Sequence, residues 1–155
     1  MVTLIYIQVY KGDFLMAKYK TLIEYLTVFI IGAVIYSVCE ICWRGYTHWT
    51  MTFAGGFCLI CIYLSSNKYP DRMLWLQCAE GCLTITAIEF IIGYIVNIQL
   101  KWNVWDYTDI PFNIMGQVCL SYMAVWFIMS IPAVFICRLL RTKLFYRGVI
   151  FNGKT

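Results

Sequence analysis

The stretch Ile114–Leu140, IMGQVCLSYMAVWFIMSIPAVFICRLL, is long enough and apolar enough to cross a lipid bilayer as a helix. A helix rises about 1.5 Å per residue, so about 20 apolar residues span a hydrocarbon core of about 30 Å. Three other runs have the same character, namely Leu22–Cys42, Trp49–Ser66 and Met73–Asn97. The sequence therefore predicts an all-α integral membrane protein built as a four-helix bundle.

The composition leaves little material for a soluble domain. Of the 155 residues, 62% are hydrophobic and only 13% are charged. We expect a four-helix transmembrane domain over residues 21–140, with a cytoplasmic or interfacial segment before it (residues 1–20) and a basic cytoplasmic tail after it (residues 141–155). The basic tail is typical of contact with anionic lipid headgroups, so lipids rather than nucleic acids are the expected partners.

Basic residues are distributed unevenly along the chain. With four spans, ten of the twelve Lys and Arg residues fall on the side of the membrane that holds the two termini, and only Arg44 and Lys101 fall on the other. Basic residues are retained on the cytoplasmic side of a membrane. This distribution predicts a multi-pass protein of the cell membrane with both the N and C termini in the cytoplasm.

Polar side chains recur within the apolar runs at the three- and four-residue spacing of one helix face. Polar groups in hydrocarbon cost free energy and normally face the interior of a bundle. We therefore expect stripes from three helices to meet in a polar cavity that opens toward the outside, with His48 and Asp106 at its mouth. The other predicted binding residues are Glu40, Arg44, Glu89, Asn97, Asn113 and Gln117.

A purely structural interpretation stays open for some of these residues. Glu40 and Arg44 are four residues apart, which predicts an ion pair on one helix. Asn113 and Gln117 are expected on one face of the fourth helix, where amides commonly hold helices together. Glu89 is the residue least expected to be only structural, because a carboxylate in hydrocarbon is costly.

No metal or cofactor is predicted. Two cysteine pairs have C-x-x-C spacing, Cys39/Cys42 and Cys58/Cys61, but no histidine lies close to them, and cysteine commonly packs as a small apolar residue. The chain contains no G-x-x-x-x-G-K-[ST] loop, which excludes it as the nucleotide-hydrolysing subunit of a transporter. It also contains no H-E-x-x-H or G-x-S-x-G motif, so no catalytic residues are predicted.

Four blocks of sequence carry a family resemblance. They are Glu40-x-x-Trp43-Arg44-Gly45-x-Thr47-His48-Trp49, then Gly55-Gly56, then Glu89-x-x-x-Gly93-x-x-x-Asn97, then Trp105-Asp106-Tyr107-x-x-x-Pro111-x-Asn113-x-x-Gly116-Gln117. In this order the blocks resemble the ABC-transporter type IV (CmpB-like) family of small membrane proteins, over roughly residues 25–130. Thr50 and Thr108 stand where serine is expected. The resemblance implies a multi-spanning membrane protein with a role in transport.

Three functions follow from these observations. The first is a transport or channel component with an outward-facing site for a polar or cationic solute. The alternatives are a non-catalytic membrane partner or regulatory protein and, less favoured, an intramembrane enzyme that acts on a lipid-like substrate. Because four helices enclose little volume, we expect a homo-oligomer, with Gly55-Gly56 as a candidate contact. A separate ATPase or another membrane subunit is a further expected partner.

Overall fold

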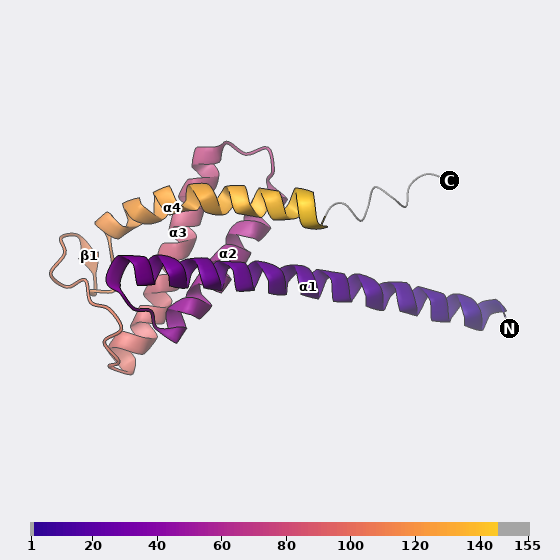
Figure 1. Cartoon of the computed structure of the whole chain (residues 1–155), viewed down its shortest axis with the longest axis horizontal. Coiled ribbons are helices and arrows are strands. Elements are labelled where there is room, and N and C mark those ends of the chain that lie inside the picture. Colours follow the sequence, from indigo (N-terminus) through magenta and orange to yellow (C-terminus); the bar gives the residue numbers. More distant parts are fainter. Residues whose placement is uncertain (1, 146–155) are drawn as a thin grey trace.

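In the part of the chain that the structure describes, four long helices form the fold, as predicted (Figure 1). The computed structural model describes the backbone of residues 2–145 and the side chains of residues 16–145. In this part of the chain, four helical stretches are long and apolar enough to cross a membrane. The helices are α1 (Val2–Arg44), α2 (Trp49–Lys68), α3 (Leu74–Gly93) and α4 (Leu120–Leu139), and π-helical turns extend α3 as η1 (Tyr94–Gln99) and α4 as η2 (Leu140–Phe145).

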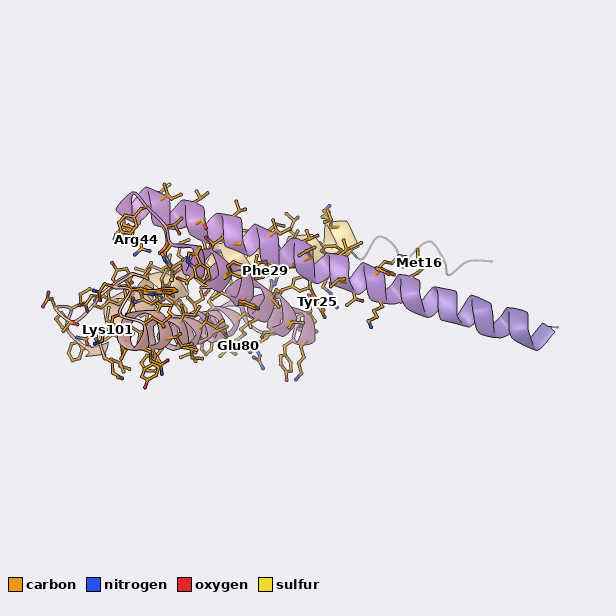
Figure 2. All side chains as sticks on the ribbon, turned by 90° about the horizontal axis from the view of Figure 1, so that it is seen from below. Met16, Tyr25, Phe29, Arg44, Glu80 and Lys101 are labelled. Atoms are coloured by element: carbon orange, nitrogen blue, oxygen red, sulfur yellow. The ribbon has the colours of Figure 1, made fainter. Side chains whose placement is uncertain are left out.

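Helix α1 is more than twice as long as any other helix and extends well past the bundle at its N-terminal end (Figures 1 and 2). Its 43 residues correspond to about 65 Å of helix, against about 30 Å of hydrocarbon. The part suited to cross the membrane is Met16–Arg44. A cytoplasmic or interfacial place for residues 1–20 stays a prediction. Of the predicted basic tail, residues 141–145 continue α4 within η2, and the rest lies outside the described residues.

The predicted start of the fourth helix was wrong. Residues before Leu120 form a short antiparallel hairpin of β1 (Asn113–Ile114) and β2 (Val118–Cys119). The turn between these strands holds Met115 at a φ of 53° and Gly116 at a φ of 68°, a left-handed conformation that no α-helix contains. Asn113 and Gln117 therefore lie in a hairpin and not on a helix face.

Glycines allow α1 and α2 to pack closely. A Cβ atom on Gly55 would lie 2.2 Å from the Cβ of Tyr36, and one on Gly32 would lie 2.5 Å from the carbonyl oxygen of Gly55. A Cβ atom on Gly56 would lie 2.5 Å from the ring of Phe29. Both glycines of the Gly55-Gly56 pair thus face α1 of the same chain. This corrects the expectation that the pair is a contact between two copies.

The four helices do not pack equally on one another. Helix α1 packs along α2, and α4 packs against α3 and α2, but α1 and α4 make no extended contact. In Figure 1, α1 and α4 run in opposite directions, while α2 and α3 cross them steeply. The space between α1 and the α3–α4 pair is where the candidate site lies.

Candidate functional site

Glu89 connects three helices through hydrogen bonds. It lies on α3 and is 2% exposed. The Tyr36 hydroxyl of α1 donates to its Oε1 over 2.6 Å, and the Trp126 indole nitrogen of α4 donates to its Oε2 over 2.7 Å. The two aromatic rings also stack, with their centroids 5.8 Å apart. One carboxyl group therefore joins α1 to α4, which otherwise have little contact.

Glu40 and Arg44 form the predicted ion pair. Arg44 Nη2 donates to Glu40 Oε1 over 2.6 Å, and Arg44 Nη1 donates to the carbonyl oxygen of Val104 over 3.0 Å. The Thr47 hydroxyl donates to the second carboxylate oxygen of Glu40. The charge of Arg44 is thus matched by Glu40. Glu89, by contrast, has no ion-pair partner among the side chains of residues 16–145.

A cavity of about 510 Å³ brings Glu40, Arg44 and Glu89 together. Its size is that of a small-molecule site, for which 300–1,000 Å³ is typical. All four helices contribute to its lining, and so does the loop between η1 and β1, through Trp105 and Tyr107. Polar groups gather around Glu89 and Glu40, while most of the remaining lining is hydrocarbon and aromatic. A charged or hydrogen-bonding group in the cavity would meet these polar groups.

Asn97 and Gln117 contact each other, but neither lines the cavity. Asn97 Nδ2 donates to Gln117 Oε1 over 2.8 Å, and Asn97 Oδ1 accepts from the Val104 amide over 2.7 Å. The Trp105 indole donates to the backbone oxygen of Gln117 over 2.9 Å. A Cβ atom on Gly93 would lie 2.5 Å from Gln117 Oε1, so only glycine leaves room for this contact. The two amides hold the loop and hairpin against α3 and η1.

The other three predicted residues make local contacts away from the cavity lining. Hydrogen bonds from the Thr108 hydroxyl and amide hold the pKa of Asp106 below its ordinary value. The Asn113 side chain donates to two loop carbonyl oxygens and accepts from the Gly116 amide over 2.9 Å. His48 caps α2 by accepting from the Thr50 amide. These residues shape the loop and the start of α2.

Three of the eight predicted binding residues, Glu40, Arg44 and Glu89, line the cavity, whereas the other five do not. A role of these residues in binding a solute stays a prediction. Trp126 was missed, and so were Tyr107 and Tyr122. A signal for Trp126 existed, because an indole N–H in the middle of an apolar span needs a hydrogen-bond acceptor.

Tyr107, together with Trp105, forms the loop side of the cavity. Burial, together with the nearby carboxylate of Glu89, raises the pKa of Tyr107 well above its ordinary value. The ring of Tyr107 stacks on Tyr122 of α4. Within residues 16–145, no group of three or more His, Cys, Asp or Glu side chains is placed to hold a metal ion.

Comparisons with known proteins agree with this architecture. A family model described as "Putative ABC-transporter type IV" matches residues 27–149, which is most of the chain. No match was found among curated proteins or among solved structures.

Proposed function

Because this chain belongs to the ABC-transporter type IV family, we propose that it is a membrane transport component whose cavity binds a polar or cationic solute at Glu89. One observation carries the proposal. Three helices hold a carboxyl group at a cavity, and that group has no cationic partner among the described side chains.

The electrostatics of the cavity favour a cation. Two carboxyl groups and one guanidinium line it, and the guanidinium is already paired with Glu40. A charge removed from water is stable only when an opposite charge or several hydrogen bonds compensate it. Glu89 receives two hydrogen bonds from neutral donors. A bound cation supplies the missing countercharge, and a proton competes with it for the same carboxyl group.

The hydrogen bonds of Glu89 also connect binding to helix movement. A ligand shifts a conformational equilibrium only by the difference between its affinities for the two states. A solute that takes a carboxylate oxygen from Tyr36 or Trp126 weakens the link between α1 and α4. Since these helices make no other extended contact, their separation is the movement we expect to accompany passage of the solute.

Catalysis receives less support than binding. For an intramembrane enzyme, the candidate acids and bases are Glu40, Glu89, His48 and Asp106. His48 caps α2, and Asp106 is held in a turn by Thr108, and neither lines the cavity. The cavity lining also contains three thiols, those of Cys39, Cys42 and Cys58, and among the described side chains none of them is hydrogen-bonded to a carboxyl group or an imidazole.

We also propose an orientation of the protein in the membrane. The uneven distribution of basic residues favours cytoplasmic termini and an extracytoplasmic Arg44 end of the bundle. Figure 2 shows Arg44 and Lys101 at the same end of the molecule, away from Met16. A membrane-impermeant amine reagent applied to intact cells should therefore modify Lys101, and should modify Lys68 only after the membrane is permeabilised. Peptide mass spectrometry measures both sites, and the reverse pattern would invert the proposed topology.

Flux through proteoliposomes tests the function itself. The full chain is reconstituted, and uptake of a panel of inorganic and organic monovalent cations is compared with uptake by protein-free vesicles. Glu89→Gln keeps the size of the side chain but removes its charge. A charge-assisted interaction contributes about 1.5–3 kcal/mol, so protein-dependent flux of the transported cation should fall about tenfold or more.

Glu80→Gln is the matched control for this experiment. Glu80 lies on the same helix, pairs with Arg72 over 2.7 Å and does not line the cavity. Its replacement should leave flux unchanged. If Glu89→Gln and the unaltered protein transport every cation equally, Glu89 has no role in transport. If Glu89→Gln lowers only thermal stability and no cation is transported, the non-catalytic partner becomes the better proposal.

Other subunits belong to the same proposal. The chain contains no nucleotide-binding loop, so any coupling to ATP hydrolysis needs a separate ATPase. A homo-oligomer remains our expectation, but its contact has to use surfaces other than Gly55 and Gly56. Native mass spectrometry from lipid nanodiscs reports the number of copies and any co-purified subunit.

A further inference from the structure

An aromatic wall stands beside Glu89 in the cavity. Tyr36 stacks on Trp126, Trp126 lies 6.5 Å from Tyr122 between ring centroids, and Tyr122 stacks on Tyr107 at 4.5 Å. All four rings line the cavity. Aromatic rings that line a pocket attract organic ammonium ions through the ring faces that a neighbouring ring does not cover.

Beyond this wall the lining is hydrocarbon. Helix α4 lines the cavity from Trp126 to Ile136, which is ten residues along the helix or about 15 Å. A strongly hydrated ion in this part would lose water without gaining polar contacts. The side chains that form the apolar part are Leu59, Ile62, Ile85, Met129, Ala133 and Ile136.

The cavity lining includes exposed residues of α1 and α4. Ile35 of α1 and Val125 of α4 both line it, yet they are 38% and 41% exposed. Both residues lie within candidate membrane spans, so their exposed faces meet lipid. The two helices have no extended contact that would close the gap between them. These exposed lining residues bring acyl chains next to the cavity.

The opposite end of the apolar part is closed. Val28 lies on α1 one helical turn before Gly32, and Tyr63 follows Ile62 on α2. Both side chains are fully buried. The Tyr63 hydroxyl donates to Glu24, which links α1 to α2 at this level. A ligand with a hydrocarbon body thus meets a defined end of the cavity.

We propose, on the basis of the transport function above, that the solute is a lipophilic organic ammonium ion that enters from the bilayer between α1 and α4. Its ammonium group lies against Glu89 and the aromatic wall. Its hydrocarbon body lies along the apolar part, toward Ile136. The carboxylate supplies charge, the rings supply cation–π attraction, and the hydrocarbon lining selects for an apolar body.

Binding to the full chain in lipid nanodiscs tests this assignment. Isothermal titration calorimetry compares hexyltrimethylammonium, tetramethylammonium and the neutral tert-butyl isostere of the hexyl compound, with empty nanodiscs as the blank. The hexyl ion has about five more methylenes than tetramethylammonium, and burial of each contributes roughly a fourfold gain in affinity, so the hexyl ion should bind up to about a thousandfold tighter. The neutral isostere should bind about tenfold more weakly than the hexyl ion, because it lacks the charge.

A pair of substitutions at Tyr122 tests the aromatic wall. Tyr122→Leu keeps an apolar side chain but removes the ring, and it should lower affinity for the hexyl ion about fivefold. Tyr122→Phe keeps the ring and should restore affinity to within about twofold. Affinity for the neutral isostere should not change in either variant. An equal affinity of both variants for the hexyl ion would overturn the role of the wall.

The comparison of the hexyl ion with tetramethylammonium uses the unaltered protein, so it decides the proposal even if a substituted protein folds poorly. Tetramethylammonium binding as tightly as the hexyl ion would overturn the proposed ligand class. If small cations are then transported in a Glu89-dependent manner, the transport function still stands. Conversely, Glu89-dependent binding of the hexyl ion without flux of any cation supports the ligand class and overturns the transport function.

Discussion

Replacing Gly55 with leucine is expected to disrupt the packing of α1 on α2 and to destabilise the folded protein strongly. A Cβ atom at this position would lie 2.2 Å from the Cβ of Tyr36 and 2.9 Å from the carbonyl oxygen of Gly32. Backbone atoms cannot move aside as the end of a flexible side chain can. Overpacking typically costs 1–3 kcal/mol, and we expect a loss of about 3 kcal/mol, the upper end of that range.

Thermal unfolding in detergent measures this effect, with Cys61→Leu as the matched control. Cys61 also lies on α2, but its side chain is exposed, so leucine is accommodated there without a clash. Gly55→Leu should unfold at a much lower temperature than Cys61→Leu or fail to accumulate. Similar unfolding temperatures would mean that α1 and α2 do not approach each other at Gly55. The substitution also displaces Tyr36, and therefore removes a hydrogen bond from Glu89.

Asn97→Leu should release the loop of residues 100–112 and the hairpin that follows it. The substitution leaves the Val104 amide and Gln117 Oε1 without their partners in a buried site. Each buried group left unsatisfied costs about 1–3 kcal/mol, so a loss of about 3 kcal/mol is expected. The loop also contains Lys101 and Asn103 at φ values of 56° and 50°, a conformation that non-glycine residues rarely adopt without support.

Hydrogen–deuterium exchange of peptides from residues 100–119 measures the release of the loop. Exchange in this segment should accelerate strongly in Asn97→Leu, while α2 remains protected. Gln99→Leu is the control, because Gln99 lies two residues away in η1 with an exposed side chain. Equal exchange in the two variants would contradict the role of Asn97 in holding the loop.

The four spans could be predicted because the length and hydropathy of a run decide whether a helix crosses a bilayer. The start of α4 could not be found in the same way. Ile114, Met115, Val118 and Cys119 make this stretch look like part of the apolar run, although they belong to a hairpin and its turn. Asn113 and Gly116 were the available sign of a turn, since asparagine and glycine at this spacing are typical of turns.

The candidate site was predictable where helical spacing alone decides which residues share a face. Glu40 and Arg44 are four residues apart on a single helix, and their ion pair followed directly from that spacing. The partners of Glu89 depend on how three helices pack, and a single sequence does not contain that information. Asn97 and Gln117 were correctly expected to be buried, but their side chains satisfy one another and hold a loop.

The structure thus divides the polar residues into two groups with different roles. The amides Asn97 and Gln117 have their hydrogen bonds satisfied within the protein, as expected of groups that stabilise a fold. Glu89 has two neutral donors, no countercharge among the described side chains and a cavity beside it. Substitutions in the first group should affect stability, whereas the conservative change at Glu89 should affect binding.

Infrared difference spectroscopy tests directly whether a cation binds at Glu89. Spectra of the protein in lipid are recorded before and after addition of hexyltrimethylammonium, for the unaltered chain, Glu89→Gln and Glu80→Gln. The cation should change the carboxyl bands of the unaltered protein and of Glu80→Gln, and this change should be absent in Glu89→Gln. The same change in all three proteins, or no change in any, would contradict a cation site at this carboxyl group.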